Sequence, residues 1–157
     1  MPAINCQIVE ICVFKKLHDS IRYLLLKRSA DDVLYPGIWQ LVTGMMEPSE
    51  TAVLAALREL SEETGLEFKN IWVVPFVNSF YVVSSDTVHL SVFFAVEVDS
   101  DSDPRLSTEH QAWVWSEYEE AQKTLIWPGQ KHALELTHHF IIGSEGASQL
   151  VRVDLSK

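Results

Sequence analysis

Short apolar runs alternate with polar residues at the start of the chain. Residues 6–14 and 22–27 are rich in β-branched and aliphatic side chains, and the polar residues 15–20 lie between them. Runs of this length and composition predict two strands that pair as a hairpin. The second run contains consecutive leucines at positions 24–26, so it lacks the alternation of a strand with one wet face. We therefore expect this strand to be covered on both sides.

A helical period replaces the strand pattern between Glu50 and Thr64. Apolar residues recur there every three or four positions, which predicts an amphipathic helix that docks on a core. They are Val53, Leu54, Leu57 and Leu60. Ser49 is a suitable N-cap residue, and Gly65 suits the left-handed position that follows a helix. These two limits give a helix of about four turns.

Four further β-rich runs, bounded by turn residues, predict strands. They lie at residues 38–42, 71–83, 88–98 and 112–115. The first leads the chain to Gly44, and the middle two are expected to pair in a central sheet. The acidic residues 99–104 contain a proline and predict a solvated loop.

Two more helices are expected towards the C-terminus. Residues 116–123 carry Ser116 as a cap and Glu119 three positions later, which is the spacing of a capping box. Residues 129–142 predict a final helix, and residues 143–157 fit a terminal strand or a tail. This alternation of strands and helices predicts an α/β or α+β fold.

Size and charge narrow the class of protein. With 157 residues, of which 47% are hydrophobic, residues 1–157 can bury one sizeable core, so we expect a single domain. The net charge of −10 argues against a nonspecific nucleic-acid surface, which needs clustered lysine and arginine. No apolar run approaches the length of a membrane span, and we expect no signal peptide.

Cysteine placement suggests a compartment. Cys6 and Cys12 lie on one expected strand, and six residues of extended chain separate them by roughly 20 Å, beyond the reach of a disulfide. We expect buried thiols in a reducing environment, and therefore a cytoplasmic protein.

Three carboxylates share one face of the helix 50–64. Glu59, Glu62 and Glu63 stand at spacings of three and four residues, with no basic residue between them. Like charges at these spacings repel, more strongly when partly buried. A hard divalent cation would turn this repulsion into a favourable interaction, since Mg²⁺ and Mn²⁺ bind carboxylates and bridge to phosphates. An ordinary solvated acidic face is the alternative.

A longer pattern surrounds these carboxylates. Gly44 is followed after five residues by Glu50, and after seven more by the run Arg58-Glu59-Leu60-Ser61-Glu62-Glu63-Thr64-Gly65-Leu66. This pattern resembles the Nudix box at every fixed position. The resemblance implies an α/β/α sandwich with a central mixed sheet, the box helix on one face and the C-terminal helix on the other. It also implies a divalent-metal hydrolase of a small-molecule phosphate anhydride, typically a nucleoside diphosphate linked to another group.

The resemblance further implies roles for individual residues. The ligands of Mg²⁺, for which Mn²⁺ can substitute, would be Glu59, Glu62, Glu63 and the Gly44 carbonyl. Arg58 would pair with Glu62 or Glu50 and orient the carboxylates. Glu109, in the segment Thr108-Glu109-His110, resembles a further acid of the family that is either a metal ligand or the general base. Surface charge is the alternative for Glu109.

Two stretches resemble the branch of the family that hydrolyses dihydroneopterin triphosphate: Trp39-Gln40-Leu41-Val42-Thr43-Gly44 and residues 127–135. We therefore expect pyrophosphate release from a triphosphate, with dihydroneopterin triphosphate favoured. Purine (deoxy)nucleoside triphosphates and other nucleoside diphosphate-linked compounds are the alternative. The candidate substrate contacts are Arg28, Trp39 and Gln40. Arg28 can equally pair with a nearby aspartate, and Trp39 can be core.

Two readings from other classes stay open. One is a noncatalytic Nudix-fold sensor, which would be expected to lose box carboxylates, and the other is a structural acidic domain. The sequence does not decide between a monomer and a homodimer.

Overall fold

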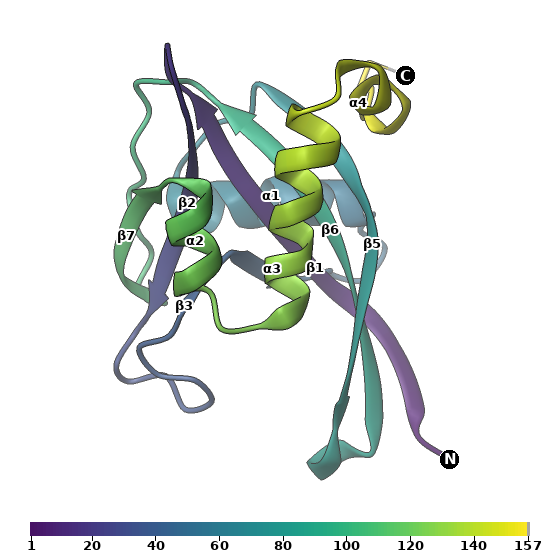
Figure 1. The fold of residues 1–157 in the computed structure, drawn as a ribbon. Coiled ribbons are helices and arrows are strands. Elements are labelled where there is room, and N and C mark those ends of the chain that lie inside the picture. Colours follow the sequence, from purple (N-terminus) through teal and green to yellow (C-terminus); the bar gives the residue numbers. More distant parts are fainter. Residues whose placement is uncertain (157) are drawn as a thin grey trace.

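The computed structural model describes residues 1–156, and a mixed β-sheet forms its centre (Figure 1). The strands are β1 (Ala3–Lys16), β2 (Ile21–Arg28), β3 (Trp39–Gln40), β4 (Val42–Met45), β5 (Asn70–Val82), β6 (Thr87–Val98) and β7 (His110–Ser116). Within the described residues they form one sheet in the order β3-β2-β1-β6-β5, with β4 paired to β1 and β7 to β2. β1 is parallel to β6 and antiparallel to β2 and β4. The predicted hairpin is confirmed as β1–β2, and the predicted central pair as β5–β6.

Helices cover both faces of this sheet. They are α1 (Ala52–Thr64), α2 (Tyr118–Thr124), α3 (Pro128–Leu136) and α4 (Glu145–Val151), with a 3-10 segment η1 (Val83–Ser85) and a π-helical segment η2 (Thr137–Ile142). In Figure 1, α1 lies behind the sheet, and α2 and α3 lie in front of it. Leu24 and Leu26 of β2 pack in one core cluster with Leu60 of α1, whereas Leu25 packs in the other with Leu134 of α3. The expected sandwich and the strand covered on both sides are therefore confirmed.

Helix α1 has a different N-cap from the predicted one. The prediction of Ser49 is wrong, because Thr51 precedes the helix and its side chain accepts the N–H of Leu54 at 3.3 Å. Ser49 instead has a φ of 68°. It lies in a turn that the Glu50 carboxylate closes by accepting the N–H of Glu47 at 2.9 Å. An N-cap residue needs extended backbone, which Thr51 has and Ser49 does not, so Thr51 caps the helix. The predicted end at Gly65 is confirmed, with a left-handed φ of 65°.

Other element boundaries also differ from the sequence predictions. The strand expected at residues 38–42 is divided, because β3 pairs with β2 whereas β4 pairs with β1. Ser116 ends β7, and Glu117 is the N-cap of α2 without a side-chain cap, so the predicted capping box is wrong. The final helix changes at Thr137 from α-helical α3 to π-helical η2. Beyond it, α4 forms where a strand or a tail is expected.

The two cysteines have different surroundings. Both are free thiols, and Cys12 is buried as predicted, but Cys6 is exposed. The prediction fails for Cys6 because the N-terminal end of β1 extends past the helical layers (Figure 1). Across residues 1–156, none of the helices is long and apolar enough to cross a membrane.

Candidate active site

Strand β4 brings Gly44 against the acidic face of α1. A Cβ atom added to Gly44 would lie 2.0 Å from Cδ of Glu59, far inside van der Waals contact. Burial raises the pKa of Glu59, and the adjacent Arg58 guanidinium acts in the opposite direction. Glycine is therefore required at position 44 if the Glu59 carboxylate is to lie against the backbone of β4.

Arg58 ties the loop before α1 to the acidic face of the helix. Its Nε and Nη2 donate to the two carboxylate oxygens of Glu50, at 2.8 Å each. Its Nη1 donates to Glu59 at 2.9 Å and to Glu62 at 3.2 Å. Hydrogen bonds from Arg58 hold the pKa of Glu50 at about 2, so Glu50 stays ionised. Arg58 thus contacts both of the acids, Glu50 and Glu62, that the sequence offers as its partners.

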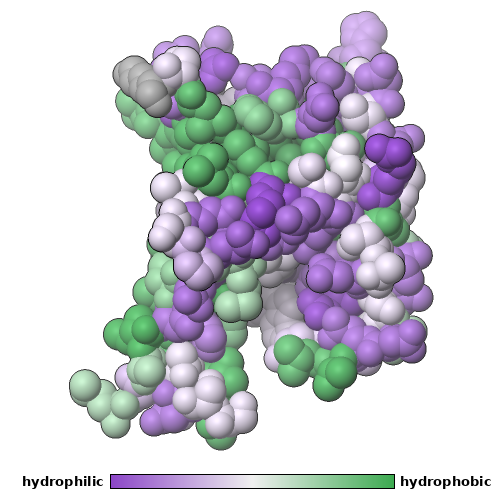
Figure 2. Space-filling view, turned by 180° about the vertical axis from the view of Figure 1, so that it is seen from behind, coloured by the Kyte–Doolittle hydropathy of each residue, from purple (hydrophilic) through white to green (hydrophobic). Residues whose placement is uncertain are grey.

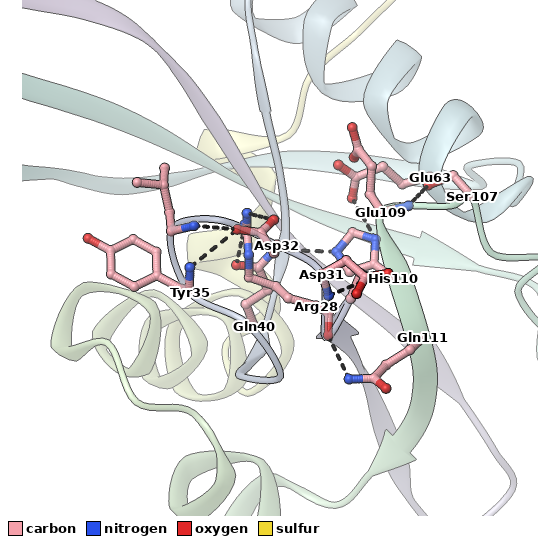
Figure 3. A network of polar contacts seen from close by, with 12 residues as sticks. Arg28, Asp31, Asp32, Tyr35, Gln40, Glu63, Ser107, Glu109, His110 and Gln111 are labelled. Atoms are coloured by element: carbon pink, nitrogen blue, oxygen red, sulfur yellow. Dashed lines mark hydrogen bonds and ion pairs between the residues drawn. The ribbon is translucent and has the colours of Figure 1, made fainter.

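The loop between β6 and β7 carries Glu109 to the end of α1. The backbone N–H groups of Arg105 and Ser107 donate to carbonyls in the last turn of α1, at 2.8 and 3.2 Å. The carbonyl of Glu109 accepts the N–H of Ser29 at 2.9 Å, which fastens the loop to the residue that follows β2. Figure 3 shows the side chains of Glu109 and Glu63 close together as a result. The fold therefore gathers acids from two distant parts of the sequence.

The pKa of Glu63 is strongly perturbed. Its side chain is buried, with the residue only 3% exposed, and its Oε2 has no hydrogen-bond partner among residues 1–156. Burial, reinforced by the Glu109 and Glu59 carboxylates, raises the pKa of Glu63 to about 9. Ligand atoms of Glu63, Glu109 and His110 lie within 4.8 Å of one another. Acids gathered in this way can hold a metal ion, and a hard cation would favour the carboxylates over the imidazole.

His110 lies between these acids and a cavity. Gln40 Oε1 accepts from Nη1 of Arg28 at 3.4 Å, so the Gln40 amide nitrogen faces Nε2 of His110, at 3.3 Å. Because an amide nitrogen only donates, Nε2 of His110 accepts, and the ring proton lies on Nδ1. That atom is 4.0 Å from Oε2 of Glu63. Burial lowers the pKa of His110, which keeps the ring neutral. A path of polar contacts therefore runs from Arg28 to Glu63.

A cavity of about 790 Å³ opens beside this path. Its polar lining includes Glu10, Arg28, Gln40, Thr43, Asn78 and Gln130, and its aromatic lining includes Tyr35, Phe80, Tyr81 and Trp127. In Figure 2 a hydrophilic band crosses the face of the molecule where α1 lies. Below this band, the surface is hollowed between the β5–β6 hairpin and the loop that joins β2 to β3 (Figure 2). A cavity of this size accommodates a heterocycle with part of its phosphate chain.

The structure brings together some of the candidate site residues and separates others. Glu59 and Glu63 lie on the inner side of α1, and Glu109 joins them from the loop. The Glu62 side chain is 58% exposed and contacts Arg58 instead. Arg28 and Gln40 line the cavity. Arg28 also forms an ion pair with Asp32.

Trp39 lies outside the cavity lining in the described structure. It is half-buried against the core cluster on the α3 side of the sheet, and Nζ of Lys27 lies 5.8 Å from its ring centroid.

Two residues at the site, His110 and Glu10, are not among the candidates predicted from the sequence. For Glu10 a signal was present, because it is the one charged residue in the apolar run from position 8 to position 14.

Comparisons with known proteins agree with this geometry. The NUDIX domain family model matches residues 8–137. The asymmetrical bis(5′-nucleosyl)-tetraphosphatase of Mus musculus is 30% identical over 128 residues, which cover 80% of this chain and 85% of that protein. The dihydroneopterin triphosphate diphosphatase of Escherichia coli (strain K12) is 42% identical over 59 residues, 38% of this chain and 37% of that protein. An octanoyltransferase of Myxococcus xanthus is 33% identical over 135 residues, and the match covers 81% of this chain but only 35% of that protein.

Solved structures show the same fold. A C. elegans Ap4A hydrolase in a binary complex superposes with a TM-score of 0.71 at 24% identity, covering 87% of this chain and 98% of that chain. The E. coli dihydroneopterin triphosphate pyrophosphohydrolase superposes with a TM-score of 0.65 at 25% identity, covering 87% of this chain and 96% of that chain. Since the family model spans most of the sequence and the box residues meet beside the cavity, the chain belongs to the Nudix hydrolase family.

Proposed function

We propose that this Nudix protein uses Mg²⁺, or Mn²⁺ in its place, to hydrolyse the phosphate anhydride of a small molecule that carries a flat ring. The observation that carries the proposal is the acidic cluster of Glu59, Glu63 and Glu109 beside the Gly44 backbone, with Glu63 buried. The adjoining cavity offers space for the ring. A phosphate-binding end and a ring-binding end would therefore be neighbours.

Each polar group near the cluster has a role in this proposal. When bound, a divalent cation neutralises phosphate charge and lowers the pKa of a water molecule. Glu59, Glu63 and the Gly44 carbonyl would hold the cation. Glu62 would have to turn away from Arg58, which it contacts at 3.2 Å, to join them. Arg58 would keep Glu59 in position through the contact that it makes at 2.9 Å. Glu109 is exposed on a loop that is anchored to α1 and to Ser29, so it would either take the proton of the attacking water or join the ligands.

The cavity residues would contact the rest of the substrate. Arg28 and Gln40 both line it, and Arg28 would balance phosphate charge. Trp39 would act by packing against neighbouring residues rather than by touching the ring. Tyr35 and Trp127 both line the cavity and contact each other edge to face, with ring centroids 5.0 Å apart, so a free face of one of them would be the stacking surface.

We favour dihydroneopterin triphosphate as the substrate. Support comes from the two sequence stretches that resemble that branch and from the 42% identity over 59 residues to the E. coli enzyme. Hydrolysis would give dihydroneopterin monophosphate and pyrophosphate. A dinucleoside tetraphosphate is the second candidate, because the similarity to the mouse tetraphosphatase covers 80% of this chain. Purine (deoxy)nucleoside triphosphates are a further alternative.

Product analysis on a substrate panel tests the proposal. The protein would be incubated with dihydroneopterin triphosphate, diadenosine tetraphosphate, dGTP and dATP, with Mg²⁺ and with EDTA, and the products separated by anion-exchange chromatography. We expect hydrolysis that requires Mg²⁺ and the highest kcat/KM for the pterin. A tenfold or greater advantage of a nucleotide would overturn the pterin assignment alone. Absence of Mg²⁺-dependent hydrolysis of all four compounds would overturn the hydrolase proposal for these classes.

A further inference from the structure

Glu10 puts a carboxylate into the middle of the sheet, on the α3 side. The residue is 6% exposed, and its neighbours in β1, Val9 and Ile11, are fully buried. Val9 and Ile11 belong to the core cluster on the α1 side, so Glu10 points the other way along the alternating strand. Carboxylates are seldom buried without a positive partner. Within residues 1–156, however, the hydrogen-bond partners of Glu10 are the neutral side chains of Ser91 and Gln130.

These two partners hold the carboxylate in one orientation. Ser91 Oγ donates to Oε1 of Glu10 at 2.9 Å, and Gln130 Nε2 donates to Oε2 at 2.7 Å. Gln130 is itself only 4% exposed, and its Oε1 accepts the backbone N–H of Leu41 at 3.3 Å. The amide cannot turn over without losing both contacts, so its nitrogen is fixed against Glu10. Glu10 and Gln130 therefore form a rigid pair.

This pair still has unused hydrogen-bonding capacity, and both of its residues line the cavity. A carboxylate can accept about four hydrogen bonds, and an amide nitrogen carries two hydrogens. Glu10 accepts two bonds and Gln130 Nε2 donates one within the described residues. Both residues line the 790 Å³ cavity, together with Gln40 and the aromatic Trp127. The cavity wall thus presents two acceptor atoms followed by a donor, next to an aromatic side chain.

We propose that the Glu10–Gln130 pair selects a flat ring whose edge carries an amino group, a ring N–H and a carbonyl side by side. This is the 2-amino-4-oxo edge that pterins share with guanine. The carboxylate would accept from the amino group and the ring N–H, and the free hydrogen of Gln130 Nε2 would meet the carbonyl. The inference rests on the proposed function, because it names the ring that the same site takes.

Adenine fits this wall poorly. Its edge offers an amino group and then a ring nitrogen with a lone pair. In one register a carboxylate oxygen would face that lone pair, and in the register shifted by one position the other carboxylate oxygen would have no donor. Rings of this type are expected to bind about 10- to 100-fold more weakly than 2-amino-4-oxo rings, since a buried polar group is left unpaired.

Substitution of Glu10 by Gln tests the selection. The change keeps the shape but replaces one acceptor oxygen by an amino group, so a ring with two adjacent donors loses a partner. Glu97→Gln is the matched control, because Glu97 is also buried in the sheet, on β6, but lies outside the cavity lining in the described structure. Circular dichroism and thermal unfolding would establish that both variants fold.

Two readouts separate this inference from the hydrolase proposal. The first is kcat/KM for dihydroneopterin triphosphate, dGTP and dATP. The second is equilibrium binding of dihydroneopterin, guanosine and adenosine by calorimetry in Mg²⁺ buffer, which needs no hydrolysis. We expect Glu10→Gln to lower both kcat/KM and the binding affinity by about 10- to 100-fold for the pterin and guanine compounds, and by less than about threefold for the adenine compounds. Glu97→Gln should leave the ratios unchanged.

The outcomes are distinct. Selective binding of the 2-amino-4-oxo rings without hydrolysis would overturn the hydrolase proposal and keep the ring assignment. Equal binding of all three compounds by the wild-type protein, or ratios that Glu10→Gln does not change, would overturn the ring assignment even if hydrolysis is found. A Glu10→Gln variant that does not fold leaves the wild-type binding ratios to decide.

Discussion

Replacing Glu63 by Gln should make the metal-free protein more stable at neutral pH. In the wild-type protein, burial and the Glu109 and Glu59 carboxylates raise the pKa of Glu63 from 4.5 to about 9. The folded state therefore binds more protons than the unfolded state between these two pH values. Stability from this group is fully present below the unfolded pKa and is lost as the pH rises towards the folded pKa. A glutamine side chain at this position has no proton to lose.

The size of the effect follows from proton linkage. One proton difference changes the free energy of unfolding by about 1.4 kcal/mol per pH unit. Between about pH 5.5 and about pH 7.5 the wild-type protein should therefore lose about 3 kcal/mol relative to Glu63→Gln. Other groups, such as the neutral His110, titrate in both proteins and cancel to a first approximation in the difference.

Urea unfolding followed by tryptophan fluorescence, in EDTA at the two pH values, measures this difference. Added Mg²⁺ should recover stability in the wild-type protein more than in Glu63→Gln, because a ligand that binds the folded state stabilises it. If the difference in unfolding free energy between the two proteins is the same at both pH values, the conclusion that burial raises the pKa of Glu63 is refuted.

Three further substitutions probe the surroundings of Glu63. Gly44→Ala should lower kcat by about tenfold or more, because the new Cβ would lie 2.0 Å from Cδ of Glu59; unchanged steady-state kinetics would contradict this packing. Arg58→Lys should lower kcat and raise the Mg²⁺ concentration needed for half-maximal rate, since lysine cannot bind Glu50 through two nitrogens; a Mg²⁺ titration equal to that of the wild type would argue against a positioning role. Glu109→Gln should lower kcat by about 100-fold with the Mg²⁺ requirement unchanged if Glu109 is the base. If Glu109 is a ligand, the Mg²⁺ requirement should rise. A variant that shows neither effect would mean that Glu109 is only surface charge.

Elements with a local signal could be predicted from the sequence. The consecutive leucines at positions 24–26 indicate a strand covered on both faces, and Gly65 marks the end of α1. The start of α1 could not be read in the same way, since Ser49 and Thr51 can both cap a helix. The choice depends on Glu50, whose carboxylate contacts Arg58 eight positions further on. A contact of that kind is visible only in the folded chain.

The candidate site also has parts that could be predicted from the sequence and parts that could not. The acidic face of α1 and the need for glycine at position 44 follow from a motif with fixed spacing. The location of His110 could not be predicted, because it depends on contact with Gln40, which is 70 positions away. Glu62 illustrates the limit of spacing arguments. It follows Glu59 by three positions, the spacing of a shared helix face, yet its carboxylate contacts Arg58 and is largely exposed.

The turnover of Glu63→Gln at saturating Mg²⁺ tests most directly whether the box carboxylates form the catalytic metal site. Wild type, Glu63→Gln and Glu67→Gln would be compared on the best substrate of the panel, with Glu67 as an exposed acid just beyond α1. We predict that Glu63→Gln lowers kcat by at least about 100-fold. Glu67→Gln should stay within about twofold of the wild type. Full turnover by Glu63→Gln, with the same products, would contradict the assignment.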